Sequence, residues 1–68
     1  MQRKQIESFE KWIILKDALV AQHYKLWQFQ YNWDLPEGFI AGFISGDKRV
    51  EIVTHIKDIE DDIINSRW

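Results

Sequence analysis

The sequence predicts an all-α domain made of a long N-terminal helix, a short middle helix and a C-terminal helix. Two observations support this prediction. No Gly or Pro occurs from residue 2 to about residue 31, and apolar residues recur there at intervals of three and four, which is the helical period. The whole chain holds only 3 Gly and 1 Pro in 68 residues, which argues against a disordered or loop-rich polypeptide. Residues 1–68 are too few for more than one domain.

The first predicted helix spans residues 2–31 and would be ~45 Å long at 1.5 Å per residue. Its apolar residues form two neighbouring stripes. The first stripe contains Ile6, Phe9, Ile13, Val20, Tyr24, Trp27 and Tyr31. The second contains Trp12, Leu15, Leu19, Leu26, Phe29 and Trp33. A helix with so broad an apolar surface needs cover on two sides.

The second predicted helix spans residues 36–45, after a break at 32–36 in which Pro36 suits the first helical position. Three glycines follow at intervals of four, at Gly38, Gly42 and Gly46. They predict a bare helix edge that another backbone can approach closely, with Gly46 as the C-terminal cap.

The third predicted helix spans residues 47–66, because apolar residues keep a helical spacing from Ile52 through Ile64. The alternative is an α+β fold, in which strands 39–45 and 49–56 form a hairpin between two helices, joined by a turn at Gly46 and Asp47. The many β-branched residues favour this alternative. The helix is preferred because an isolated two-stranded sheet is only marginally stable.

The charges of the predicted helices are opposite to those that helix dipoles favour. Arg3 and Lys4 open the first helix, whereas acidic residues gather near the end of the third. This pattern predicts that the third helix packs antiparallel to the first, with its acidic end beside Arg3 and Lys4. One alternative is an antiparallel homodimer of the long helix, in which Glu7 and Glu10 face Lys25 of the second copy. The other is a solvated acidic face with no specific neighbour.

Several classes of function lack support in the sequence. The histidines, His23 and His55, stand beside no recognisable set of nucleophile and base, so we expect no enzyme and no catalytic residue. The glycines match no phosphate-binding motif, and we expect no cofactor. The absence of cysteine favours a cytoplasmic protein, and no apolar run is long enough for a membrane span.

The aromatic content of 15% is the most unusual number in the composition, and it suggests that some aromatic residues meet a partner. We therefore predict a small non-enzymatic interaction or regulatory module that forms a homodimer through its long helix and also binds another protein. The predicted partner or dimer anchors are Trp12, Trp27, Tyr31 and Trp33. The predicted electrostatic surface for a partner is Asp58, Glu60, Asp61 and Asp62.

Two alternative functions remain open. A dimeric helix-turn-helix-like regulator would place Lys48 and Arg49 against DNA phosphates, but the net charge of -2 and the acidic third helix do not favour nucleic acid. A metal- or ligand-binding bundle would use a stripe on the third helix, and its members are Glu51, His55, Asp58 and Asp62. Because one helix cannot complete a site, we expect this stripe to be a polar flank and predict no metal.

Overall fold

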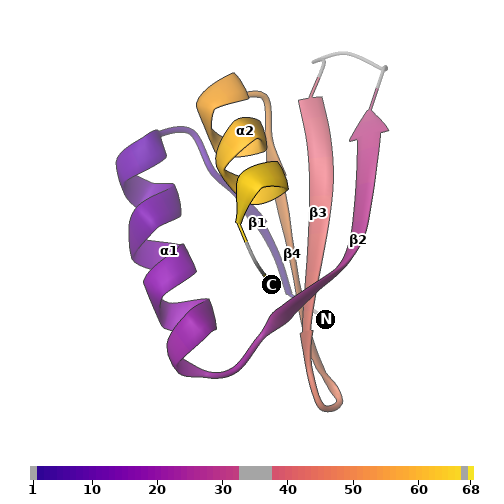
Figure 1. Cartoon of the computed structure of the whole chain (residues 1–68). Helices are drawn as coiled ribbons and strands as arrows, with labels where there is room; N and C mark the ends of the chain where they lie inside the picture. Colours follow the sequence, from indigo (N-terminus) through magenta and orange to yellow (C-terminus); the bar gives the residue numbers. More distant parts are fainter. Residues whose placement is uncertain (1, 33–37, 67) are drawn as a thin grey trace.

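The computed structural model describes residues 2–32, 38–66 and 68 (Figure 1). These residues form four strands and two helices. In chain order the elements are β1 (Gln2–Gln5), α1 (Phe9–Ala21), β2 (Lys25–Asn32), β3 (Gly38–Ser45), β4 (Lys48–Thr54) and α2 (Lys57–Asn65). The protein is therefore an α+β fold, and the prediction of an all-α helical bundle is wrong.

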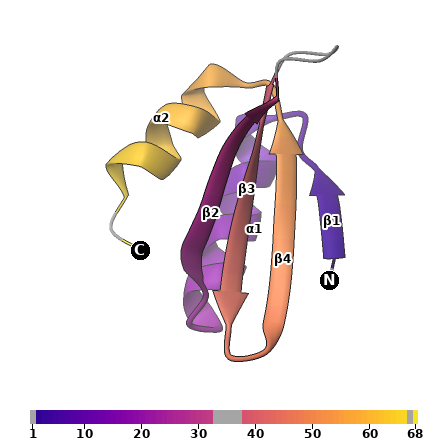
Figure 2. The ribbon, with the colours of Figure 1, turned by 90° about the vertical axis from the view of Figure 1, so that its right-hand side faces the viewer.

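The four strands form one mixed sheet in the order β1-β4-β3-β2. β1 runs parallel to β4, whereas β3 runs antiparallel to both β4 and β2. Both helices lie on the same side of this sheet, so that Figure 2 looks onto the opposite side with α1 behind the strands. We call these two sides the helix-covered face and the uncovered face.

The predicted long helix is shorter than expected, because α1 begins after the N-cap Ser8 and ends at Ala21. The reason is local: His23 has a φ of 62°, which is left-handed backbone that stops an α-helix. The amide of Tyr24 then donates to the carbonyl of Leu19 at 2.9 Å, which closes the helix end. The aromatic stretch that follows forms β2 instead of further helical turns.

The predicted helices 36–45 and 47–66 are also wrong, because most of this stretch forms the hairpin of the alternative interpretation. β3 and β4 pair from Phe39↔Thr54 to Ser45↔Lys48, and Gly46 turns the chain with a φ of +61°. The argument against an isolated hairpin fails because β1 and β2 extend it on both sides. A Cβ at Gly38 would lie 2.6 Å from the carbonyl oxygen of Thr54, so the close backbone approach is between strands.

The acidic residues of the third predicted helix have a different explanation in this fold. α2 begins only at Lys57, so Asp58 and Glu60 lie in its first turn, where the helix dipole favours acids. Lys48 belongs to strand β4. The predicted antiparallel pairing of two long helices is therefore absent, and Arg3 in β1 pairs instead with Glu51 in β4.

The hydrophobic core lies between the helix-covered face and the two helices. Its fully buried members include Trp12 of α1, Phe43 of β3 and Ile59 of α2. Trp68 docks onto this core, with its ring centroid 4.8 Å from that of Phe43. Within the described residues, neither helix is long and apolar enough to cross a membrane.

A polar network joins α1 to α2 above this core. The indole N–H of Trp12 donates to Oδ2 of Asp62 at 2.7 Å, and Nζ of Lys16 donates to the same oxygen at 2.9 Å. Lys16 also donates to Oγ of Ser66 at 3.0 Å. The buried indole nitrogen therefore has a charged acceptor, and the carboxylate has a cation beside it.

Candidate functional site

The structure separates the predicted anchors instead of gathering them on one helix face. Trp12 is 0% exposed and belongs to the core, so it offers no surface to a partner. Trp27 and Tyr31 are both in β2 and are 45% and 48% exposed. Trp33 lies outside the described residues.

The predicted acidic surface is also divided between internal and exposed groups. Asp62 is held by Trp12 and Lys16 within the molecule. Partial burial alone would raise the pKa of Asp62, but the hydrogen bonds from Lys16 and Trp12 and the charge of Lys16 lower it overall. Asp58 and Asp61 are exposed on α2, so only part of the predicted surface is available to another molecule.

Tyr31 is the predicted anchor that lies beside the acidic helix. Its phenol hydrogen bonds to the Glu60 carboxylate. Desolvation, the Glu60 charge and its hydrogen bond, and the charge of Asp61 together raise the pKa of Tyr31. The Tyr31 ring also packs edge-on against Phe29, at 5.3 Å between centroids. Tyr31 thus joins β2 to α2, and the carboxylates of Glu60 and Asp61 lie near it.

Trp27 reaches the uncovered face because β2 contains a bulge between Leu26 and Gln28. Leu26 is paired with Phe43, and Phe29 is paired with Ala41. Both partners are fully buried, so Leu26 and Phe29 face the helices. In a regular strand one residue would separate two side chains on the same face, but here two residues separate them. The extra residue allows Trp27 to point away from the core while the aromatic residues after it point inward.

The indole of Trp27 lies over Gly42 on the neighbouring strand. A Cβ added to Gly42 would lie only 2.8 Å from Nε1 of Trp27, so the ring occupies the space that a side chain would fill. The guanidinium carbon of Arg49 lies 5.2 Å from the centroid of the Trp27 ring, within the range of a cation–π contact. Trp27 is therefore held in place while nearly half of its surface stays accessible.

A buried carboxylate lies next to this indole in the sheet register. Glu51 is paired with Gly42 and is only 9% exposed. The Arg3 guanidinium donates to Oε1 of Glu51 through Nε at 3.1 Å and through Nη2 at 2.9 Å. Glu51 is the one acidic residue among the described residues of the four strands, and it thus already has a cationic partner.

Apart from Glu51, the charged residues that the strands place on the uncovered face are cationic, and they lie among apolar residues and the neutral amides of Gln28 and Gln30. Lys25, Ile44 and Arg49 form one row across the sheet in the observed register. Among the described residues, ion pairs join only Arg3 to Glu51 and Lys16 to Asp62, so Lys25 and Arg49 keep uncompensated charges. Ile40, Ile44 and Val53 are half-buried there. We call the group of Lys25, Trp27, Gly42, Ile44 and Arg49 the Trp27 surface.

Sequence reasoning missed Gly42 and Arg49 as neighbours of Trp27, because it assigned all of them to helices. The β-branched run after Gly46 was the signal for the strand that carries Arg49. The stripe considered for a metal is split between β4, the segment after it and α2. Across residues 2–32, 38–66 and 68, no group of three or more metal-ligating side chains occurs.

Comparison of the chain with protein-family models, with curated proteins and with solved structures found no match. The function is therefore inferred from the chemistry of the surface.

Proposed function

We propose that this protein is a small, non-enzymatic interaction module of the cytoplasm that binds an acidic segment of another protein on the Trp27 surface. The observation that carries the proposal is the exposed indole of Trp27, fixed over Gly42 and beside Arg49 on a sheet face that neither described helix covers. Tryptophan and arginine dominate the binding energy of many protein interfaces. A fixed ring also loses little conformational freedom on binding.

The charges of the Trp27 surface favour an acidic partner. Lys25 and Arg49 have no described ion-pair partner, and the Glu51 charge is compensated by Arg3. Half-buried Ile44 supplies apolar area between these cations in the same row of the sheet. A segment with carboxylates on either side of an apolar side chain would match this row in both charge and character.

A protein fits this surface better than a nucleic acid. The chain has a net charge of -2, and nucleic-acid binding depends on neutralising many phosphates. Asp58 and Asp61 are exposed on α2 and would repel a long polyanion. A short acidic segment confined to the uncovered face avoids that repulsion.

A second copy of the chain is the other candidate partner, although the long dimerisation helix that was predicted does not exist. Its support comes from the outer surface of α1, where several large apolar residues are exposed. These are Phe9, Ile13, Ile14 and Val20. Apolar exposure of this kind on one helix is typical of contact surfaces, and it lies on the side of the sheet away from Trp27.

The test is selection from a random peptide library displayed on phage, followed by titration of selected peptides against the ¹⁵N-labelled protein. We expect the selection to yield acidic peptides that contain an apolar residue. In the titration, the amide signals of Trp27, Gly42 and Arg49 should show saturable chemical-shift changes. Trp27→Ala should weaken binding at least 30-fold, since a tryptophan hot spot contributes about 2 kcal/mol or more. Tyr31→Ala is the matched control, because Tyr31 is equally exposed but beside α2.

Two results would contradict the proposal. One is that selected peptides bind Trp27→Ala as tightly as the original chain. The other is that the shifts map to α1. Light scattering over the same concentrations tests whether a second copy of the chain is the partner. Self-association through α1 would raise the mass without any peptide, and Ile14→Lys would abolish it.

A further inference from the structure

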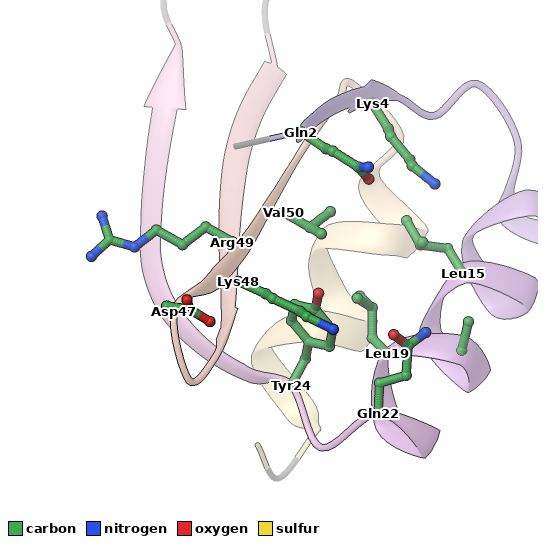
Figure 3. Close-up of a pocket in the computed structure, with 11 residues that line it drawn as sticks. Gln2, Lys4, Leu15, Leu19, Gln22, Tyr24, Asp47, Lys48, Arg49 and Val50 are labelled. Atoms are coloured by element: carbon green, nitrogen blue, oxygen red, sulfur yellow. The ribbon is translucent and has the colours of Figure 1, made fainter.

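A cleft lies on the helix-covered side of the sheet, and it is separate from the Trp27 surface. Its volume is about 480 Å³, within the range of small-molecule sites. It lies between the second half of α1, strand β1 and the start of β4 (Figure 3).

The floor of the cleft is apolar. Leu19, Tyr24 and Val50 line it, and each is at least nine-tenths buried. Leu15 continues the same apolar surface along α1. A flat or branched apolar group could therefore be desolvated there.

The rim of the cleft is cationic and rich in hydrogen-bond donors. Lys4 of β1 and Lys48 of β4 both point toward the cleft in Figure 3, and the amides of Gln2 and Gln22 lie around it. Neither lysine pairs with a described carboxylate. Asp47 also lines the cleft, but it lies at the hairpin turn beyond Lys48, and Arg49 extends away from the cleft.

Two polar side chains of the rim come from the helix-facing side of β1. Gln2 is paired with Val50 and Lys4 with Ile52, so both occupy the helix-facing rows that are apolar in β3 and β4. Both residues are exposed because β1 is an edge strand of the sheet, so their polar ends can reach the rim of the cleft. An edge lysine can also hinder sheet-to-sheet pairing, but that role requires neither a cleft nor a second lysine on β4.

We propose that this cleft binds a small organic anion, with a phosphate or carboxylate group between Lys4 and Lys48 and an apolar group on Leu19, Tyr24 and Val50. Two ammonium groups can each donate charge-assisted hydrogen bonds to such an anion. The inference does not depend on the proposed protein partner, because the two sites lie on opposite faces of the sheet.

The test is titration of the ¹⁵N-labelled protein at low ionic strength with phenyl phosphate, benzoate, inorganic phosphate and neutral benzamide. We expect saturable shifts at Lys48, Val50 and Leu19 with an aryl anion, weaker binding of inorganic phosphate, and no binding of benzamide. The comparison of phenyl phosphate with benzoate identifies the preferred anionic group. Lys4→Met and Lys48→Met should each weaken binding about tenfold or more.

Lys57→Met is the matched control, because Lys57 is an exposed lysine of α2 outside the lining of the cleft, and it should leave binding unchanged. The proposal is overturned if no probe gives saturable shifts at the cleft. It is also overturned if Lys48→Met, whose fold is checked by the same spectra, binds the aryl anion as the original chain does. Equal binding of the aryl anion and inorganic phosphate would contradict the role of the apolar floor.

Discussion

Comparing one tryptophan from each face of the sheet shows how differently the two faces are built. On the helix-covered face, Trp12 packs from α1 with no exposed surface, and its indole N–H is used by Asp62. On the uncovered face, Trp27 is nearly half exposed, and Arg49 lies beside its ring. Trp12 therefore contributes to stability on the helix-covered face, whereas Trp27 contributes accessible apolar area on the uncovered face.

This difference shows that the aromatic excess has two separate origins. Phe29, Phe39 and Phe43 pack on the helix-covered face with Trp12 and Trp68, where a core this small needs large side chains. Trp27 does not contribute to that core cluster. Its exposure is the result of a bulge in β2, which is a feature of the backbone and not of composition.

The largest expected effect comes from truncating the two tryptophans in turn. Trp12→Ala should lower the free energy of unfolding by about 3–5 kcal/mol, which is comparable to the whole stability of a domain this size. Trp27→Ala should lower it by about 1 kcal/mol or less, because only a cation–π contact and partial packing are lost. Urea denaturation followed by far-UV circular dichroism measures both values.

If Trp12→Ala does not fold, the milder variant Trp12→Phe can be measured in its place. Trp12→Phe should still have a lower free energy of unfolding than Trp27→Ala. Equal losses for the two tryptophans would show that the uncovered face contributes to the core as much as the covered one. That result would remove the distinction between the faces.

A smaller effect is expected from the carboxylate that joins the helices above the covered face. Asp62→Asn should lower the free energy of unfolding by about 1–3 kcal/mol, because Trp12 and Lys16 lose a charged acceptor. Asp17→Asn, at an exposed site of α1, is the control and should change it by about 0.5 kcal/mol or less.

The same carboxylate should also make stability depend on pH. Because the pKa of Asp62 is lowered in the folded protein, its ionised form stabilises the fold at neutral pH. That contribution is lost as the pH falls below the ordinary aspartate range toward the folded pKa. Thermal unfolding between pH 7 and pH 2 should therefore show a smaller acid-induced drop for Asp62→Asn than for the original chain, and identical drops would contradict the assignment.

The smallest effect on stability, but a specific one, is expected from filling the space under Trp27. Gly42→Ala should displace the indole, since the new Cβ would lie 2.8 Å from Nε1 of Trp27 if the ring did not move. We expect a clear shift of the Trp27 indole N–H signal in NMR spectra, with the Trp12 signal nearly unchanged. An unmoved Trp27 signal would mean that Gly42 does not set the position of the ring.

The sequence contains correct signals for α1 and for the core, but periodicity alone could not locate the strands. Tyr24, Leu26, Phe29 and Tyr31 are separated by two, three and two positions, because the bulge interrupts the strand period of two. That spacing resembles an irregular helical stripe. The helix end at His23 has no Gly to mark it, since a histidine adopts the left-handed conformation there.

The C-terminal stretch was ambiguous for a related reason. Val50, Ile52 and Thr54 follow the strand period, whereas Ile56, Ile59 and Ile63 follow the helical one. Ile52 and Ile56 fit either pattern, so a single helix through the whole stretch looked continuous. The contacts of Trp27 with Gly42 and Arg49 depend on pairing between three strands, and they could not be predicted before the register was known.

The pairing of β1 with β4 has a consequence for the order in which the chain folds. Arg3 and Glu51 are 48 positions apart in the sequence, and closing so long a loop carries a large entropic penalty before any contact rewards it. During synthesis, β1 must wait for β4 to leave the ribosome before it can join the sheet. In the folded protein the same strand should be the first to detach, and each detachment would remove Gln2 and Lys4 from the rim of the cleft. Loss of the anion site and local unfolding of the sheet edge would then be a single event.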